Sequence, residues 1–145
     1  MATINTHIIF KEHCEEAFRF YQSIFGGKYS YFGRFKEMPM KDVQTVPAEV
    51  AEKIMHISLP ISKETALSGS DSYETFGTKT IYGNNFSLSV NAASKEEADT
   101  LFKALSANGK VEMAMEDTFW GGYFGTFTDQ FGVNWMINFD KSKAK

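Results

Sequence analysis

The sequence predicts an α+β fold made of two βαβββ units, because one pattern of residues occurs twice. The segment HCEEAFRFYQSIFGGK at 13–28 returns in altered form as SKEEADTLFKALSANGK at 94–110. Each copy follows a short apolar run and precedes aromatic, strand-like segments. A repeated supersecondary unit has an apolar face that must be buried, so such a repeat defines an architecture before any local motif does. We expect two curved mixed sheets around a cavity.

The repeat also predicts the domain organisation. A length of 145 residues fits a single domain. We expect this domain to consist of repeats at about 1–72 and 84–140, joined by a linker at 73–83. Apolar residues make up 43% of the chain, which is enough to form a buried core.

The first copy begins with an apolar run at 4–10 that is rich in β-branched residues, which predicts a strand. A helix is predicted over 14–25, because apolar residues recur there at the spacing of one helical face. Two glycines, at 26 and 27, end this helix by allowing a positive φ. The apolar residues of the predicted helix are Ala17, Phe20, Tyr21 and Ile24.

Three further strands are predicted in the first copy, at 28–35, 54–60 and 64–70. The segment 36–53 is an insertion punctuated by Met and Pro, and it is expected to hold a short helix at 48–53. This insertion is either an adaptable lid or dimer arm, or a plain surface loop.

The second copy repeats the same order of elements. FSLSV at 86–90 alternates as a strand, and Ser94 with Glu97 forms the S-x-x-E pattern of a capping box before the helix. Later strands are predicted at 111–115, 122–128 and 133–139, with a hairpin turn at 129–132 that ends on glycine. The apolar residues of this helix are Ala98, Leu101, Phe102 and Leu105.

Alternation in the strand at 86–90 predicts a polar concave face. Phe86, Leu88 and Val90 are expected to face the helix, because side chains alternate between the two faces of a strand. The intervening Ser87, Ser89 and Asn91 then face the opposite way. A polar concave face suggests a ligand site.

Composition excludes several classes of partner. The net charge is −3 and the lysines are spread thinly, so the basic stripe that nucleic-acid binding requires is missing. The sequence contains neither a signal-peptide pattern nor an apolar run long enough to span a membrane, which indicates a cytoplasmic protein. A single cysteine, Cys14, rules out a disulfide within the chain.

Several segments together resemble the PhnB-like branch of the vicinal oxygen chelate superfamily, which includes glyoxalase I and the fosfomycin- and bleomycin-resistance proteins. The resemblance covers 4–139, and the run DTFWGGYFGTFTDQFGVNW is its most specific part. It implies a paired-repeat fold and a homodimer. Members are often labelled 3-demethylubiquinone methyltransferase-like. The segments are EEAFRFYQSIFGG, KIMHISLP with LSGSD, FSLSV, SKEEADTLFKALSANGKV and DTFWGGYFGTFTDQFGVNWMINF.

The label of methyltransferase finds no support in the sequence. A nucleotide-binding turn would lie between a strand and a helix. The glycines at 121, 122 and 125 lie instead between two predicted strands. They are better interpreted as places where a strand bends around a cavity.

The resemblance also implies positions for a divalent metal, which superfamily enzymes hold with His, Gln or Glu, two from each repeat. A hard cation requires oxygen or imidazole ligands, and these positions carry neither a carboxylate nor an imidazole. We therefore expect no metal and no cofactor. A shift of one residue in the first strand would bring in His7, and His56 is the other candidate, although a structural role is the favoured interpretation of both. The expected positions are Thr6, Ala66 or Ser68, Ser87 and Met136.

The leading hypothesis is a homodimer that binds a small molecule and has no catalytic residue. Cys14 lies at a helix N-terminus beside His13, where a thiol can become reactive, but a small capping side chain explains it as well. The rival hypothesis is a metal-assisted lyase, isomerase or transferase that uses His7 and His56. A third is an interaction scaffold whose cavity is closed by Phe and Met. The predicted ligand-binding residues are Thr6, His56, Ser87, Ser89, Trp120, Met136 and Asn138.

Overall fold

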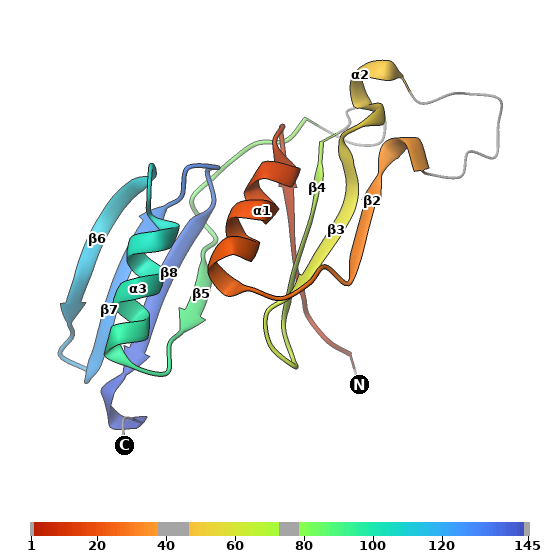
Figure 1. The fold of residues 1–145 in the computed structure, drawn as a ribbon. Helices are drawn as coiled ribbons and strands as arrows, with labels where there is room; N and C mark the ends of the chain where they lie inside the picture. Colours follow the sequence, from red (N-terminus) through yellow and green to blue (C-terminus); the bar gives the residue numbers. More distant parts are fainter. Residues whose placement is uncertain (1, 38–46, 73–78, 144–145) are drawn as a thin grey trace. The chain divides into compact units, whose positions relative to one another are not determined.

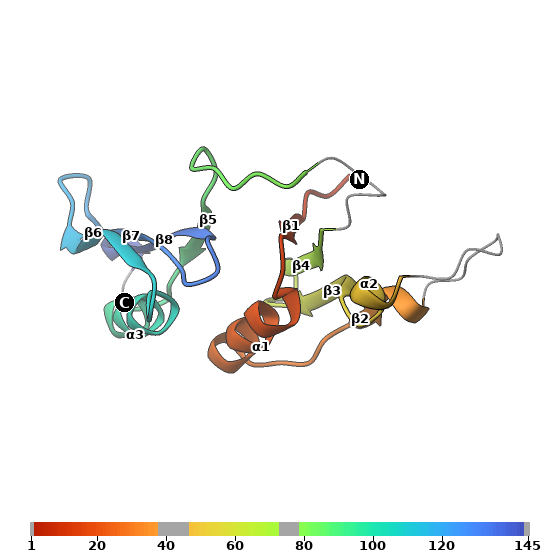
Figure 2. The same ribbon diagram turned by 90° about the horizontal axis from the view of Figure 1, so that it is seen from above.

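The computed structural model describes residues 2–37, 47–72 and 79–143. The chain divides into two compact units, residues 1–81 and 82–145, and each unit contains a four-stranded mixed sheet with a helix on one face (Figures 1 and 2). This confirms the α+β class and the two mixed sheets. The arrangement as one domain with a linker at 73–83 stays a prediction, because 73–78 lie outside the described residues.

The first unit has the sheet order β1-β4-β3-β2, in which β1 runs parallel to β4 and the other neighbours are antiparallel. The short helix expected in the insertion is present as α2, while 38–46 lie outside the described residues. The elements are β1 (Thr6–Phe10), α1 (Cys14–Phe25), β2 (Tyr31–Arg34), the 3-10 helix η1 (Phe35–Glu37), α2 (Ala48–Ala51), β3 (Ile54–Pro60) and β4 (Ala66–Asp71).

The core of the first unit lies between α1 and its sheet. Phe18 of α1 meets Phe10 of β1 edge-on, with ring centroids 6.2 Å apart, and both side chains are buried. The ring of Phe18 lies directly over Gly69 of β4. A Cβ atom added to Gly69 would lie 2.7 Å from Cε2 of Phe18. Glycine at this position therefore allows the helix to approach the sheet closely.

The second unit has the corresponding order β5-β8-β7-β6, again with one parallel pair, β5 and β8. Its elements are β5 (Leu88–Asn91), α3 (Lys95–Leu105), β6 (Lys110–Asp117), β7 (Gly122–Thr128), β8 (Asn134–Asp140) and the 3-10 helix η3 (Lys141–Lys143). Several predicted bounds differ by one or two residues; β8, for example, is shifted by one residue from the expected 133–139. β5 begins two residues later than expected, because its pairing with β8 starts at Leu88 opposite Trp135, and β6 extends to Asp117.

Trp135 is the largest fully buried side chain in the described part of the second unit. Its indole Nε1 donates a hydrogen bond of 2.9 Å to Oδ2 of Asp129. The other carboxylate oxygen of Asp129 accepts the backbone N–H groups of Phe131 and Val133, and this forms the predicted hairpin turn between β7 and β8. One buried carboxylate thus connects the turn to the core.

The two main helices begin in different ways. The hydroxyl of Ser94 accepts the N–H of Glu97 at 3.0 Å, as the capping box predicts, although the Glu97 carboxylate returns to the N–H of Ala93. His13, before α1, has a left-handed φ of 71° and its side chain does not cap the helix. The cap comes from Asp71 at the end of β4, whose Oδ1 accepts the N–H of Cys14 at 2.9 Å.

Candidate functional site

The faces of the sheets that point away from the helices carry several of the candidate site residues, including His56, Ser89, Met136 and Asn138. In the second unit, Tyr123 and Phe127 of β7 contact α3, because the Tyr123 hydroxyl donates to Asp99 and the Phe127 ring packs against Phe102. The residues of β7 that alternate with Tyr123 and Phe127 therefore point to the opposite face of the sheet, which no described helix of this unit covers and which we call the open face. Phe124 is one of these residues.

Strand register brings the predicted polar residues of the second unit together. Met136 and Asn138 alternate with buried core residues of β8 and so lie on the open face. Ser89 pairs with Met136, and Phe124 pairs with Asn138 from the other side. Asn138 also donates a long hydrogen bond of 3.5 Å to Asn91 of β5. The open face of the second unit therefore joins amide and hydroxyl groups to an aromatic ring and a thioether.

Trp120 lies at one end of this face, in the turn between β6 and β7. Its side chain is 59% exposed, and its ring contacts that of Phe124 at 6.2 Å between centroids. A Cβ built on Gly122 would lie 2.8 Å from Trp120 Nε1 and 3.3 Å from Asn138 Oδ1. The indole therefore lies over Gly122, close to the Asn138 amide.

Two other predicted site residues, Ser87 and Thr6, do not lie where the sequence analysis expects them. Ser87 precedes β5 and is exposed, and Phe86, expected to face the helix, is 81% exposed. The orientation expected for Thr6 is wrong, because Thr6, Ile8 and Phe10 share the face of β1 that packs against α1. His7 takes the position on the open face.

His56 belongs to a separate cluster on the open face of the first sheet. Its ring stacks on that of His7, with centroids 5.4 Å apart and planes at 18°, and Tyr31 lies at 5.4 Å on another side. His7 Nε2 is 3.2 Å from the hydroxyl of Ser70. Burial, and secondly the neighbouring His56, lower the pKa of His7. Both effects favour the neutral form of the His7 imidazole.

The register also corrects the expected metal positions. Central open-face residues of the parallel strand pairs are His7 with Ser68 in the first unit and Ser89 with Met136 in the second. One imidazole, two hydroxyls and a thioether do not fit a hard divalent cation. Within residues 2–37, 47–72 and 79–143, no three His, Cys, Asp or Glu side chains lie close enough together to hold a metal ion.

Cys14 lies in the core rather than at a site. Its side chain is fully buried. Burial, together with Asp71 and Glu15, raises the pKa of the thiol, which therefore stays protonated. This geometry favours the structural interpretation of Cys14.

An open groove of about 410 Å³ lies at the start of α1. Glu15, which lines the groove, accepts a hydrogen bond of 2.6 Å from Arg19, another lining residue, and one of 2.8 Å from Arg34 of β2, which lies outside the lining. The hydrogen bond from Arg34, followed by that from Arg19, lowers the pKa of Glu15 to about 2. The groove was missed by sequence reasoning, because its lining residues, such as Glu15, Lys53 and Asp71, come from segments far apart in the chain.

The two βαβββ units with polar open faces define a protein of the glyoxalase/bleomycin-resistance fold class. The model of the 3-demethylubiquinone-9 3-methyltransferase family matches residues 2–138, and the chain belongs to this family. It is a PhnB-like member of the vicinal oxygen chelate superfamily, as the sequence motifs predict.

Relatives of similar length support this assignment. The chain is 33% identical to protein YjdN of Escherichia coli (strain K12) over 144 residues, which covers 97% of both chains. It is 38% identical to protein PA1353 from Pseudomonas aeruginosa, whose crystal structure superposes with a TM-score of 0.82 over 97% of this chain and 98% of that one.

More distant structures share the fold. A putative 3-demethylubiquinone-9 3-methyltransferase, PhnB protein, from Bacillus cereus is 24% identical, with a TM-score of 0.75 over 95% of this chain and 99% of that one. A glyoxalase/bleomycin resistance protein/dioxygenase family enzyme from Burkholderia phytofirmans is 19% identical, with a TM-score of 0.60 over 93% of this chain and 97% of that one.

Among the described helices, none has the length and apolar character needed to cross a membrane.

Proposed function

We propose that this protein binds a small molecule on the open face of its second sheet and does so without the divalent metal of the superfamily enzymes. The observation that carries the proposal is the grouping of Trp120, Phe124, Met136 and Asn138 on that face. Aromatic and thioether groups beside a few hydrogen-bonding groups are the usual lining of a small-molecule site.

The proposed mode of action is binding rather than catalysis. Ser89, Asn91 and Asn138 supply neutral hydrogen-bonding groups that orient a ligand, while the Trp120 ring supplies apolar contact area. The family name suggests methyl transfer. The glycines at 121 and 122, however, lie at a hairpin between antiparallel strands, which lacks the helix N-terminus that a nucleotide-binding turn uses.

We also infer a homodimer, as the family resemblance implies, and a cytoplasmic location, as the sequence analysis predicts. The exposed apolar side chains of Ile9 on β1 and Val111 on β6 are compatible with a protein surface that a second chain covers. Sedimentation over a range of concentrations tests this inference, and a monomer at all concentrations contradicts it.

A metal-assisted lyase, isomerase or transferase is the second candidate, and the pairing of His7 with His56 is the observation that favours it. Against it, the two rings are stacked with planes at 18°, an arrangement in which each ring meets the other through its face rather than through a nitrogen. The described residues add a hydroxyl from Ser70 beside His7 and a phenol ring from Tyr31 beside His56, but not a carboxylate. The donors therefore suit a metal poorly.

Metal content and ligand binding together separate the two candidates. Untagged protein, dialysed mildly, is expected to hold less than about a tenth of an equivalent of zinc, nickel or manganese per chain by elemental analysis. Half an equivalent or more, lost in His56→Ala, would establish the metal site instead. For the binding proposal, a ligand found by thermal-shift screening should lose affinity in Trp120→Ala and Ser89→Ala. Unchanged affinity in both variants would refute the proposed site.

A further inference from the structure

The turn between β6 and β7 displays two aromatic rings next to a third ring on the sheet. Phe119 is 98% exposed and Trp120 is 59% exposed. The Phe119 and Trp120 centroids lie 5.0 Å apart with planes at 86°, and Trp120 and Phe124 lie 6.2 Å apart with planes at 65°. The three rings meet at steep angles. We call this arrangement of Phe119, Trp120 and Phe124 the aromatic corner.

Hydrogen bonds hold the turn that carries the aromatic corner. The N–H of Thr118 donates to the carbonyl of Gly122 at 2.9 Å, and the N–H of Gly122 donates to the Thr118 hydroxyl at 2.9 Å. Gly121 has a φ of +88°, which favours glycine. Gly122 leaves room for the indole of Trp120, as an added Cβ would lie 2.8 Å from Nε1. The backbone of the turn that carries the rings is therefore ordered before a ligand binds, which lowers the entropy cost of binding.

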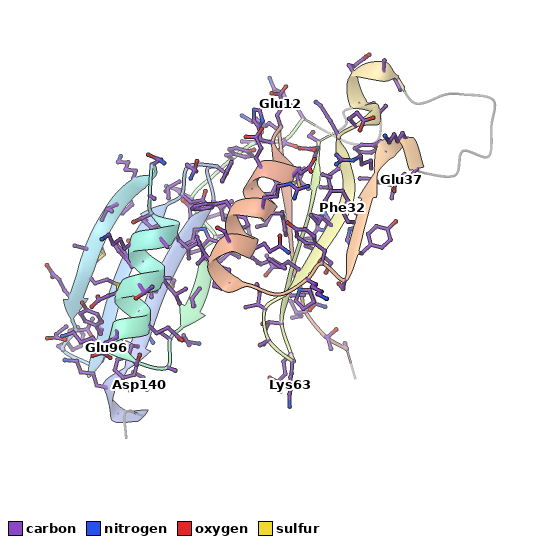
Figure 3. All side chains as sticks on the ribbon, in the orientation of Figure 1. Glu12, Phe32, Glu37, Lys63, Glu96 and Asp140 are labelled. Atoms are coloured by element: carbon purple, nitrogen blue, oxygen red, sulfur yellow. The ribbon has the colours of Figure 1, made fainter. Side chains whose placement is uncertain are left out.

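Two carboxylates share the open face with these rings. Glu116 pairs directly with Phe124, and Asp140 pairs directly with Gly122. Directly opposite residues of antiparallel strands point to the same face. Figure 3 shows Asp140 at the end of β8. The nearby cation of Lys141 is engaged by Asp117, which pairs with the helix-facing Tyr123.

We propose that the aromatic corner recognises an organic cation, a quaternary or protonated amine on a small apolar body. The faces of aromatic rings attract cations through their quadrupole, and Trp does so most strongly. Glu116 and Asp140 add negative charge beside the rings, and Asn138 offers a hydrogen-bonding group within the same face. A methylated ammonium group matches this surface, because it is weakly hydrated and can contact the rings through its methyl groups. This inference rests on the proposed small-molecule function and specifies its ligand class.

Choline and its neutral carbon isostere, dimethylbutanol, form a matched pair of probes, because they share size and shape and differ in charge. The readout is the indole N–H signal of Trp120 in a nitrogen-15 NMR spectrum of the full chain, assigned by its loss in Trp120→Phe. We expect choline to bind at least about fivefold more tightly than the alcohol. Trp120→Leu, followed through backbone signals of β7, should weaken choline binding by about tenfold.

A matched pair of charge variants tests the carboxylate. Glu116→Gln should weaken choline binding by about two- to fivefold, because a charge near an exposed ligand contributes modestly. Glu112→Gln removes the same charge from the same strand four residues earlier, beyond a shift in strand register, and should leave choline affinity unchanged. Equal effects of the two variants would mean that general surface charge attracts the cation, and this result would overturn a specific role for the corner.

Three further outcomes would overturn the inference, and they differ in whether the proposed small-molecule function remains supported. Equal affinity for choline and dimethylbutanol removes cation recognition but keeps small-molecule binding on this face. A Trp120 signal that moves with protein concentration, and not with choline, shows that a second copy of the chain covers the corner. If neither probe binds while a screened ligand depends on Ser89, the proposed function stands without this ligand class.

Discussion

Removal of the Asp71 carboxylate is expected to destabilise the first unit strongly. Asp71 is 6% exposed, and its two oxygens accept the N–H of Cys14 at 2.9 Å and that of Ile54 at 2.8 Å. Asp71→Ala leaves both buried donors without this acceptor. An unsatisfied buried group costs about 1–3 kcal/mol, so the expected loss is about 2–6 kcal/mol. For a chain of this size that corresponds to a melting temperature lower by roughly 5–20 °C.

Two comparison variants make this test specific. Asp71→Asn keeps one acceptor and opposes the other N–H with an amide, so its loss should be smaller, about 1–3 kcal/mol. Ser94→Ala removes a more exposed cap at α3 and should cost about 1 kcal/mol. Urea unfolding followed by far-UV circular dichroism measures all three. The reasoning is refuted if Asp71→Ala lowers the free energy of unfolding no more than Ser94→Ala does.

Three further outcomes are expected. Glu15→Gln should reduce stability by about 1–2 kcal/mol at pH 7, a value discounted for partial exposure. The pKa of Glu15 is lowered from 4.5 to about 2 in the folded state, so this difference is present above about pH 5 and shrinks as pH falls through that window. Urea unfolding at several pH values checks it, with Glu64→Gln as an exposed control; a pH-independent difference contradicts it. Gly69→Ala should cost about 1–3 kcal/mol, because the new Cβ would lie 2.7 Å from Phe18 and 2.9 Å from the Ile8 carbonyl oxygen. Gly83→Ala, with its nearest contact at 3.6 Å, should melt like the wild type. Cys14 should resist a thiol reagent in the native state and react in urea, and rapid native labelling would show that the site is open.

The helices and most strands could be predicted from the sequence, because their signals are local. The apolar spacing of α1 and the Ser94 pattern before α3 each lie within one or two turns of helix, and the predicted bounds of α1 agree with the structure. The buried residues of α1, however, are Cys14, Ala17, Phe18 and Tyr21 rather than the predicted Ala17, Phe20, Tyr21 and Ile24. The face of β1 could not be predicted in the same way. Ile8 and Ile9 are both apolar but point to opposite faces, so composition did not distinguish Thr6 from His7 as the open-face residue.

The candidate site could be predicted only in part, since it depends on pairing between distant strands. Met136 was proposed from the metal position that the family resemblance implies, and the alternation of β8 in the structure places it and Asn138 on the open face. Ser87 was misplaced because FSLSV alternates over its whole length, while pairing with β8 begins at Leu88. The capping role of Asp71 joins residues 57 positions apart, and no local pattern indicates it.

The two tryptophans give the molecule a built-in pair of optical reporters. Both belong to the second unit, and the chain contains two in all. Trp135 is sealed in the core and bonded to Asp129, so its emission should be blue-shifted and resist acrylamide, while Trp120 should be quenched. Tryptophan emission therefore follows residues 82–145 alone, with one ring recording the loss of the core and the other recording events at the surface.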